Sequence, residues 1–396
     1  MYSGSIYNVQ DVYSQNNSKN VQRHPLIIGG TNFDCIWKGE KQLQFNGSSN
    51  KAEIRTATGG VGFNLASAFS KLDQEPIFLS AVGNDDAGNI VLSENPTLDK
   101  SNMLKIPDQS TASYCLILDM DGEVKLGLGD MKIHDCISNE NIENIFLKFG
   151  SSNPPLVVFD GNISTSAMNC LLKQCDERGI PVLFEPTDTY KSFKPLSLEY
   201  GNRITFASPN FNELRAMSEY VRYNECRKHE NDEFDEKDTQ SILRACLEYS
   251  MDVLPFIPVL IISLGRNGTL IVKRWPETRN ILSRISKEDV NRFDDNETIS
   301  AIHYPLGNIK EKVASVSGAG DCWITTFFTA ILKGYNQDQA VEAGNQAASM
   351  SLDHSNHNVP PELTKEKIVW HLSAKGVKLN VETRCIKENS THITLN

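Results

Sequence analysis

Short β-rich apolar segments alternate with helical segments along most of this chain, and this alternation constrains the fold more than any other feature. Segments with helical periodicity, such as residues 164–177, lie between several of the β-rich ones. Such a chain is typical of a doubly wound α/β fold, in which a mainly parallel sheet carries helices on both faces. The β-rich segments are residues 26–30, 76–83, 155–161, 180–186, 204–210 and 259–265.

Polar residues and glycines collect where these predicted strands end. Ligands of open α/β sheets bind outside the carboxyl ends of the parallel strands. The sequence therefore predicts a ligand site at this edge of the sheet. The strand-terminal residues are Gly30, Asp160, Glu185, Asn210 and Gly265.

Composition excludes several kinds of partner. The 396 residues carry a formal net charge of -11, whereas a nucleic-acid surface requires clustered Lys and Arg. No apolar run is long enough to span a bilayer, and residues 1–24 lack a signal-peptide core, so we interpret them as a disordered arm. The nine cysteines show neither a CxxC pair nor metal-ligand spacing. We expect a cytoplasmic protein with reduced thiols and no nucleic-acid or membrane partner.

Two segments interrupt the alternation, because residues 34–58 and 111–130 resemble exposed, alternating strands. The second contains Asp121 and Gly122, a strong hairpin-turn signal. Taken alone, this pattern fits a surface hairpin. Residues 222–239 are highly charged without apolar periodicity, and we interpret them as a solvated loop or helix edge of no assigned function.

A glycine-rich element directly precedes the apolar helical run 322–332. Main-chain N–H groups of Gly318, Ala319 and Gly320 would lie unpaired at the helix start, where they suit a phosphate. A carboxylate there would repel the anion unless it had a chemical role. Asp321 fits a base that takes a proton from a hydroxyl while the amides hold the phosphoryl group. The alternative is an ordinary glycine turn with Asp321 as the N-cap.

A second glycine-rich element, Gly59-Gly60-Val61-Gly62, lies far upstream and leads into a helical pattern. It does not fit a dinucleotide-binding fingerprint, since Leu65 stands at the third glycine position and no suitably placed acidic residue follows. A nicotinamide-dependent dehydrogenase is therefore the remotest interpretation.

The two glycine-rich elements, in this order, resemble the signature regions of the ribokinase-like (PfkB-type) sugar and nucleoside kinases. The resemblance implies a ribokinase-like domain over residues 25–375, with segments 34–58 and 111–130 as a β-sheet lid and residues 376–396 as a tail. It implies phosphoryl transfer from ATP to an alcohol, with Asp321 as base beside an anion hole. Lids of this family can pair between subunits, so a homodimer is an expectation.

The resemblance also places an acceptor site near the first strand. Asp34 occupies the family's sugar-binding Asp position, close to Asn32, and a carboxylate can accept hydrogen bonds from both hydroxyls of a vicinal diol. Gly59 and Gly60 would let the sugar approach the main chain, and Asn64 could bond a hydroxyl. Taken alone, an Asp after a strand is as consistent with a simple cap.

Nucleotide-binding residues are implied in the second half of the chain. Asn210 and Glu213 match an Asn-x-x-Glu motif that could order water around Mg²⁺, although the same spacing is that of a capping box. Ser263, Gly265 and Gly268 resemble a turn near the nucleotide, and they fit a β-hairpin equally well. Asn345 would lie near the adenine by analogy.

Local stretches at residues 59–66, 184–188 and 317–322, with Lys191, are similar to the pseudouridine-phosphorylating branch of the family. This implies phosphorylation of the 5′-hydroxyl of pseudouridine with ATP and Mg²⁺. It also implies coupling to a pseudouridine-phosphate glycosidase, which is fused to this domain in many animals and is absent from these 396 residues. Kinases of other ribose-bearing acceptors, such as ribose or adenosine, and a non-catalytic binding protein of the same fold are the alternatives.

Two departures from the family pattern bear on the site. Phe63 stands where relatives often carry Arg, which removes a polar contact. Ser315 and Val316 replace an Asp-Thr pair whose Asp lies near a monovalent-cation site, and this leaves a K⁺ requirement open.

Overall fold

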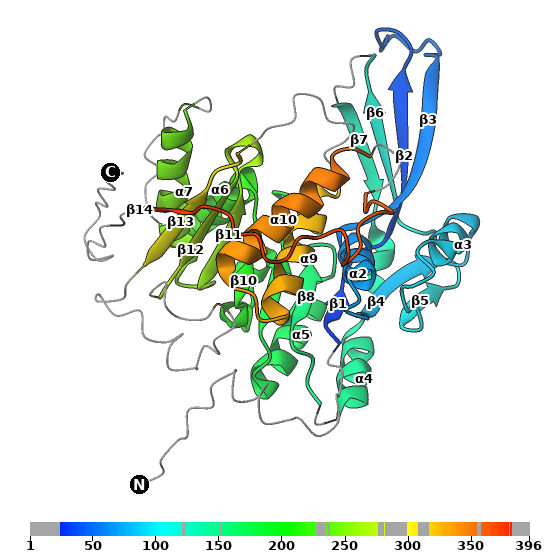
Figure 1. Ribbon diagram of the computed structural model, residues 1–396. Helices are drawn as coiled ribbons and strands as arrows, with labels where there is room; N and C mark the ends of the chain where they lie inside the picture. Colours follow the sequence, from blue (N-terminus) through cyan, green and yellow to red (C-terminus); the bar gives the residue numbers. More distant parts are fainter. Residues whose placement is uncertain are drawn as a thin grey trace.

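A large sheet forms the centre of the molecule (Figure 1). The computed structural model describes residues 24–120, 124–150, 152–226, 235, 238–275, 281, 299–307, 317–354, 358–379 and 381. Within these residues the sheet has ten strands in the order β14-β13-β12-β11-β10-β9-β8-β1-β4-β5. The strands are β1 (Leu26–Ile28), β4 (Ile77–Gly83), β5 (Met103–Ile106), β8 (Val157–Asp160), β9 (Val182–Glu185), β10 (Phe206–Ala207), β11 (Val259–Ser263), β12 (Thr269–Lys273), β13 (Ser300–Tyr304) and β14 (Val377–Leu379).

The strand directions confirm the predicted doubly wound α/β fold. From β5 across to β11 every neighbouring pair is parallel. Only the β11–β14 edge is antiparallel. All six β-rich segments read from the sequence form strands of this sheet, as β1, β4, β8, β9, β10 and β11.

Helices cover both faces and create two hydrophobic cores. Strand residues alternate between these cores: Leu26 and Ile28 face one, and Ile27 faces the other. This is the period of two expected when a strand is buried on both sides. One face carries α2 (Val61–Lys71), α9 (Ala319–Leu332) and α10 (Gln337–Ser351). The other face carries α4 (Asn139–Phe149), α5 (Thr165–Arg178), α6 (Phe211–Asn224) and α7 (Thr239–Val253). The short helix α3 (Asp86–Ser93) follows β4.

Helix ends follow local capping chemistry. The α5 helix starts after Ser164, whose hydroxyl accepts from the Ala167 amide, and ends at Gly179 in the left-handed region. The α9 helix begins at Ala319, three residues before the apolar run that predicts it. Apolar periodicity reports only the turns that face the core, so it could not mark this first, polar turn.

A second, smaller sheet projects from the main body (Figure 1). Its strand order is β3-β2-β6-β7, with β2 and β6 parallel and the outer pairs antiparallel. This confirms the separate small sheet expected from the sequence, whereas its role as a lid stays a prediction. Asp121 and Gly122 lie outside the described residues. The strands are β2 (Asn32–Gly39), β3 (Ala52–Gly59), β6 (Ser113–Leu118) and β7 (Val124–Asp130).

The start of the charged segment 222–239 forms the edge of a helix, one of its two interpretations, but its first residue is paired and not solvated. Arg222 lies in the last turn of α6, where its Nε donates to Asp252 Oδ2 of α7 at 2.7 Å. Asp252 also accepts from the Ser218 hydroxyl at 2.6 Å. The pairing partner is distant in sequence, so the charge pattern alone could not reveal it. Residues 227–234 and 236–237 lie outside the described residues.

The ends of the chain are mostly not described. Residues 1–23 of the expected N-terminal arm and 382–396 of the expected tail fall outside the described ranges. Residues 377–379, assigned to the tail from the sequence, form β14 and pair with β13.

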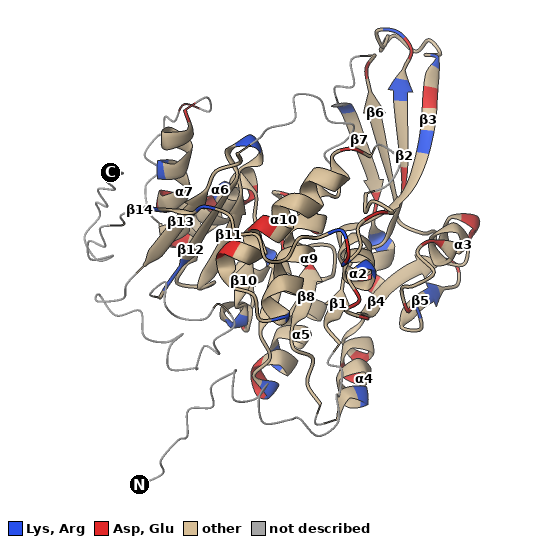
Figure 2. Cartoon of the chain, in the orientation of Figure 1, with Lys and Arg blue, Asp and Glu red and all other residues tan. Residues whose placement is uncertain are grey.

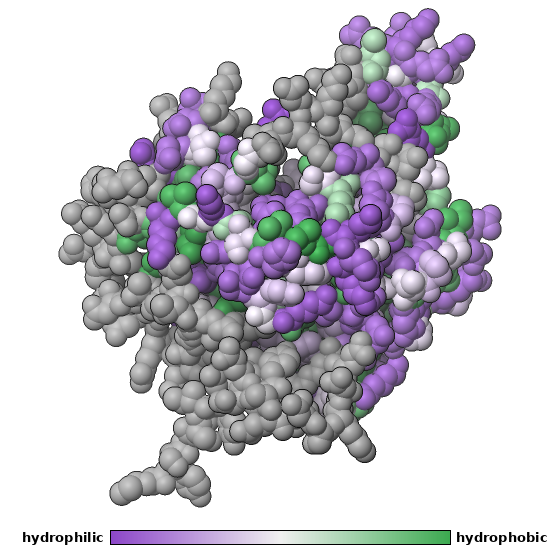
Figure 3. Space-filling view, viewed as in Figure 1, coloured by the Kyte–Doolittle hydropathy of each residue, from purple (hydrophilic) through white to green (hydrophobic). Residues whose placement is uncertain are grey.

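The visible surface is mixed in charge and polarity. Lys and Arg are interspersed with Asp and Glu along the elements (Figure 2). Hydrophilic residues dominate the described surface of this face, and hydrophobic ones form small separate groups (Figure 3). Among the described helices, none is long and apolar enough to cross a membrane. The cysteines in the described part of the chain are free thiols.

Replacing Asp252 with Ala is expected to destabilise the fold without touching the site. The substitution takes the carboxylate from Arg222 and Ser218, and breaking a buried ion pair costs about 3–5 kcal/mol. Urea unfolding followed by fluorescence should show this loss. Glu219→Ala is the control, because it breaks the exposed Arg215–Glu219 pair on the same helix and should cost less than about 1 kcal/mol. Equal losses for both variants would contradict the role given to Asp252.

Candidate active site

Asp321 lies buried in the first turn of α9. The N-cap is Gly318, so the alternative of an Asp N-cap does not hold. The Asn64 side-chain amide donates to Asp321 Oδ2 at 2.7 Å. Burial raises the pKa of Asp321 to about 7, the Asn64 hydrogen bond lowers it, and the charge of Asp160 raises it further. A carboxyl that titrates near neutrality suits proton transfer.

The glycines before Asp321 leave main-chain groups accessible. Gly318 has φ 76°, and a Cβ there would overlap the main-chain oxygen of Asn358, so only glycine fits. A Cβ on Gly320 would meet nothing within 4 Å, which leaves open space beside the first turn. Amides at a helix start have no acceptor within the helix. This end of α9 can therefore receive an anion.

The upstream glycines bring α2 against the turn between β1 and β2. A Cβ on Gly60, which has φ 90°, would lie 2.6 Å from the Gly30 oxygen, and one on Gly62 would lie 2.6 Å from the Gly29 carbonyl carbon. These close approaches account for both glycines. The predicted contact of Gly60 with an acceptor stays a prediction.

Asn32 and Asp34 are two residues apart in β2, so their side chains lie on the same face of the strand. Their Oδ1 atoms are buried and have no hydrogen-bond partner among the described residues. Leaving a buried acceptor unpaired costs about 1–3 kcal/mol, so the pair is ready for a ligand with two donors. Burial raises the pKa of Asp34 to about 6, although a hydrogen bond from Asn358 lowers it. A Cβ on Gly59 would overlap Asp34 Oδ2, so this position accepts only glycine without displacing the carboxylate.

A cavity of about 300 Å³ lies at the ends of β10 and β11. Asn210 pairs with Ser263 across a parallel bridge, which brings together two segments predicted to bind nucleotide. The capping-box interpretation is confirmed: Asn210 Oδ1 accepts from the Glu213 amide at 3.0 Å, and Glu213 Oε2 accepts from the Asn210 amide at 2.8 Å. Gly265 and Gly268, with φ 55° and 86°, form the hairpin turn between β11 and β12. Lining residues are Asn210, Phe211, Asn212, Ile242, Ser263, Leu264, Gly265 and Asn267.

Three further expectations have different outcomes. Asn345 is not among the residues that line this cavity, and its Oδ1 accepts from Trp323 Nε1 at 2.9 Å. Phe63 is buried and packs edge-to-face on Phe78, so an apolar side chain suits this position. Ser315 and Val316, on which the predicted monovalent-cation site bears, lie outside the described residues.

Residues that the sequence analysis left without a role also belong to this region. Asp160 and Glu185 end predicted strands, and that position was the available signal. Burial raises the pKa of the Glu185 carboxyl well above its usual value, and the charges of Glu213 and Asp321 add to the effect. No sequence pattern marked Asn358. Its side-chain amide donates to the Thr58 oxygen at 3.4 Å, and a contact between residues 300 positions apart leaves no local pattern.

Carboxylate oxygens make this region suitable for a hydrated cation. Burial raises the pKa of Glu213 to about 7, and the charges of Asp188 and Asp321 also raise it. Among the described residues no group of three or more His, Cys, Asp or Glu could hold a metal ion. Mg²⁺ keeps much of its water shell and prefers oxygen ligands, so the Asn210–Glu213 pair fits contact through water.

Comparison with known proteins identifies the family. Residues 23–363 match the pfkB family of carbohydrate kinases. The chain belongs to this family and is therefore a phosphotransferase that acts on a hydroxyl group.

Relatives and solved structures agree with this assignment. The chain is 27% identical to a pseudouridine kinase of Arabidopsis thaliana over 368 residues, which cover 87% of this chain and 94% of that protein. It is 27% identical to a pseudouridine-metabolizing bifunctional protein of Schizosaccharomyces pombe, covering 85% of this chain but 47% of that protein. The structure of Arabidopsis thaliana ribokinase complexed with ribose and ATP matches with a TM-score of 0.64 at 16% identity, over 89% of this chain and all of that one (100%), and shows the shared fold.

Gly59→Ala is expected to weaken use of the acceptor, because the added Cβ displaces the Asp34 carboxylate. Misplacing a binding group by about 1 Å can cost about 100-fold, so kcat/KM for the acceptor should fall between about 10- and 100-fold. Steady-state kinetics with varied acceptor would measure this. Gly307→Ala is the matched control, since its Cβ would meet nothing within 4 Å. An unchanged kcat/KM for the acceptor in Gly59→Ala would refute the predicted acceptor-binding role of Asp34.

Proposed function

We propose that the protein is an ATP-dependent kinase that phosphorylates the 5′-hydroxyl of pseudouridine to give pseudouridine 5′-phosphate. The observation that carries this proposal is the 2.7 Å hydrogen bond from Asn64 to Asp321. It joins the two glycine-rich elements across 257 residues of sequence, so that acceptor-side groups and a buried carboxyl meet at one place. The choice of pseudouridine rests on the named activity of the Arabidopsis relative.

The acceptor's ribose would occupy the face of β2 that carries Asn32 and Asp34. Their unpaired Oδ1 atoms are acceptors, and the 2′- and 3′-hydroxyls of a ribose supply two neighbouring donors. Bonding the diol there would satisfy both buried oxygens. Gly59, opposite Asn32 in the register, leaves the space that Asp34 needs.

Asp321 would act as the general base on the 5′-hydroxyl. Asn64 occupies its Oδ2, while Oδ1 accepts no hydrogen bond from the described residues and is left for the substrate. As the hydroxyl oxygen attacks the γ-phosphorus, its proton passes to Asp321. The first-turn amides of α9, at Gly318, Ala319 and Gly320, would stabilise the negative charge on the transferring phosphoryl oxygens.

ATP would bind at the cavity beside β10 and β11. The solved Arabidopsis ribokinase, which shares the fold, carries ATP together with ribose. The Asn210–Glu213 capping box would orient water around Mg²⁺, which when bound neutralises charge on the nucleotide phosphates. Ser263 and Gly265 line the same cavity, and Gly268 closes their turn.

The small sheet would act as a lid that excludes water from the transferring group. Its register places Trp37, Ile54, Leu126 and Leu128 on the face opposite Asp34, and each is between 40% and 57% exposed. Such an apolar sheet face suits pairing with a second copy, and we propose a homodimer through the lid. The product would be consumed by a pseudouridine-phosphate glycosidase.

ATP consumption across a panel of free acceptors tests the assignment. Pseudouridine should have the highest kcat/KM, with uridine, adenosine and ribose well below it. Uridine is the sharpest comparison, because it differs only in the base atom that carries the ribose. Faster turnover of adenosine or ribose would reject the pseudouridine assignment while leaving the kinase class intact.

Asp321→Asn should abolish the base while keeping the side-chain shape. Loss of a general base costs about 10²–10⁴-fold in kcat, and the KM for the acceptor should change little.

In the unsubstituted enzyme kcat/KM should rise with pH through about 7, because Asp321 must lose its proton to act. The residual activity of Asp321→Asn should lack this rise. A similar rate for the variant would refute the base assignment; Asp252→Asn, far from the site, serves as the control.

A further inference from the structure

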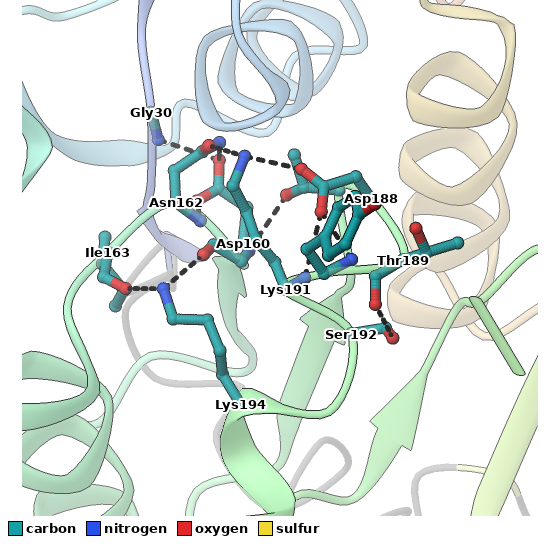
Figure 4. Close-up of polar contacts among 12 residues, drawn as sticks. Gly30, Asp160, Asn162, Ile163, Asp188, Thr189, Lys191, Ser192 and Lys194 are labelled. Atoms are coloured by element: carbon teal, nitrogen blue, oxygen red, sulfur yellow. Dashed lines mark hydrogen bonds and ion pairs between the residues drawn. The ribbon is translucent and has the colours of Figure 1, made fainter. Parts of the chain in front are cut away.

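Asp160 is a buried carboxylate at the carboxyl end of β8, and it accepts four hydrogen bonds. Its Oδ2 accepts from the amides of Gly30 and Gly62 at 2.8 and 2.9 Å. The main-chain and side-chain amides of Asn162 donate to Oδ1 and Oδ2 at 2.9 and 3.0 Å. Figure 4 shows Gly30, Asp160 and Asn162 gathered in this way. The carboxylate therefore joins three separate segments of the chain.

Each of the two glycine amides belongs to one half of the site. Gly30 lies in the turn that leads into β2, two residues before Asn32. Gly62 lies in the first turn of α2, two residues before Asn64. The acceptor strand and the helix that holds the Asp321 partner are thus attached to the same oxygen atom, Asp160 Oδ2.

The α2 helix depends on this carboxylate for its N-terminal cap. Its N-cap residue, Gly60, makes no side-chain cap hydrogen bond. Instead, Asp160 accepts from the Gly62 amide, and the Gly30 oxygen accepts from the Phe63 amide at 3.1 Å. A negative charge at a helix N-terminus is also favourable for the helix dipole.

Close packing leaves these segments little freedom to adjust. A Cβ on Gly29 would lie 2.6 Å from Asp160 Oδ2 and 2.9 Å from the Gly62 Cα. Between Gly29 and Gly62 the main chain packs directly on main chain. A movement of the Asp160 carboxylate would therefore shift both β2 and α2.

A second group of side chains holds the Asp160 turn from the other side. Lys191 Nζ donates to Asn162 Oδ1 at 3.0 Å and pairs with Asp188 at 2.7 Å. Lys194 Nζ donates to the oxygens of Gly161 and Ile163 at 2.8 and 2.7 Å. Figure 4 shows both lysines reaching toward this turn. Their positive charges oppose the buried negative charge, so the arrangement is compensated.

We propose that Asp160 is a positioning residue of the kinase reaction, which sets the acceptor strand β2 relative to the Asn64–Asp321 pair. It touches neither substrate and acts through Gly30 and Gly62. The proposal rests on the proposed function, because it assumes that β2 binds the acceptor and that Asp321 is the base.

The charge of Asp160 adds a second, independent readout. Asp321 is faced by Asn64 from α2, Asp160 from β8, Glu185 from β9 and Glu213 from α6. The Asp160 charge raises the pKa of Asp321, so an uncharged side chain at position 160 should lower that pKa. The pH at which kcat/KM rises would then move down. A residue with a purely structural role elsewhere in the core would not produce this shift.

Asp160→Ala and Asp160→Asn test the proposal in the full chain. Asp160→Ala removes all four hydrogen bonds and should lower acceptor kcat/KM by about 100-fold, with ATP affinity unchanged within about threefold. In Asp160→Asn one oxygen can still accept from both glycine amides, so the loss should be smaller, on the order of tenfold. Its kcat/KM should begin to rise at lower pH than in the unsubstituted enzyme.

Hydrogen exchange gives a measurement that does not depend on the substrate. In the free protein the amides of Gly30 and Gly62 should exchange slowly, and they should exchange faster in Asp160→Ala while α5 amides keep their rates. Asp252→Ala is the control for general destabilisation, because it removes another buried carboxylate. Any faster exchange that it causes should include the α5 amides and should not be specific to Gly30 and Gly62, and its pH profile should stay unchanged.

Several results would overturn the positioning role. They are acceptor kcat/KM in both Asp160 variants within about threefold of the unsubstituted enzyme, equal losses of acceptor and ATP binding, and unchanged exchange at both glycines. If Asp160→Ala fails to fold, Asp160→Asn decides by its acceptor kinetics and pH profile. Failure of the unsubstituted protein to phosphorylate any nucleoside would refute the proposed function instead, and faster exchange at Gly30 and Gly62 would still show the structural link.

Discussion

The arrangement of the site depends on one buried carboxylate, that of Asp160, at the end of a central strand. It accepts hydrogen bonds from the amides of Gly30 and Gly62. These bonds fix the start of β2 and the start of α2 against the sheet. A carboxylate is suited to this task, because it is an acceptor for several donors at once and carries charge toward a helix N-terminus. From α2, Asn64 then reaches Asp321 in the second half of the chain.

Buried acidic groups give the site its electrostatic character. Burial raises the pKa of Asp34 to about 6 and that of Glu213 and Asp321 to about 7. Holding ionised carboxyls away from water costs free energy of folding. The same groups can titrate near neutrality and can interact with a hydrated cation, so their placement at one edge of the sheet fits phosphoryl transfer to a hydroxyl. The family assignment and this chemistry agree.

The sequence predicted more of the fold than of the site. Residues 204–210 show both outcomes. The apolar part forms β10, and the spacing of Asn210 and Glu213 predicted the capping box that the structure contains. The bridge from Asn210 to Ser263 came only with the structure. For Arg222 the sequence allowed a place at a helix edge, but its ion pair with Asp252 was missed, because a charged residue near a helix end looks solvated until its partner is known. Asp160 was visible as a strand end, but its role required the positions of Gly30 and Gly62.

By itself the sequence determined the parallel α/β architecture, the small additional sheet, the two glycine-rich elements and the kinase family, because hydrophobic periodicity and glycine placement are local properties of the chain. Tertiary structure alone decided which groups meet: Asn64 with Asp321, Asn358 with Thr58, and Asp160 with two glycine amides. These contacts join residues between 98 and 300 positions apart. Such pairings follow from how the elements pack on the sheet, and no local pattern encodes them.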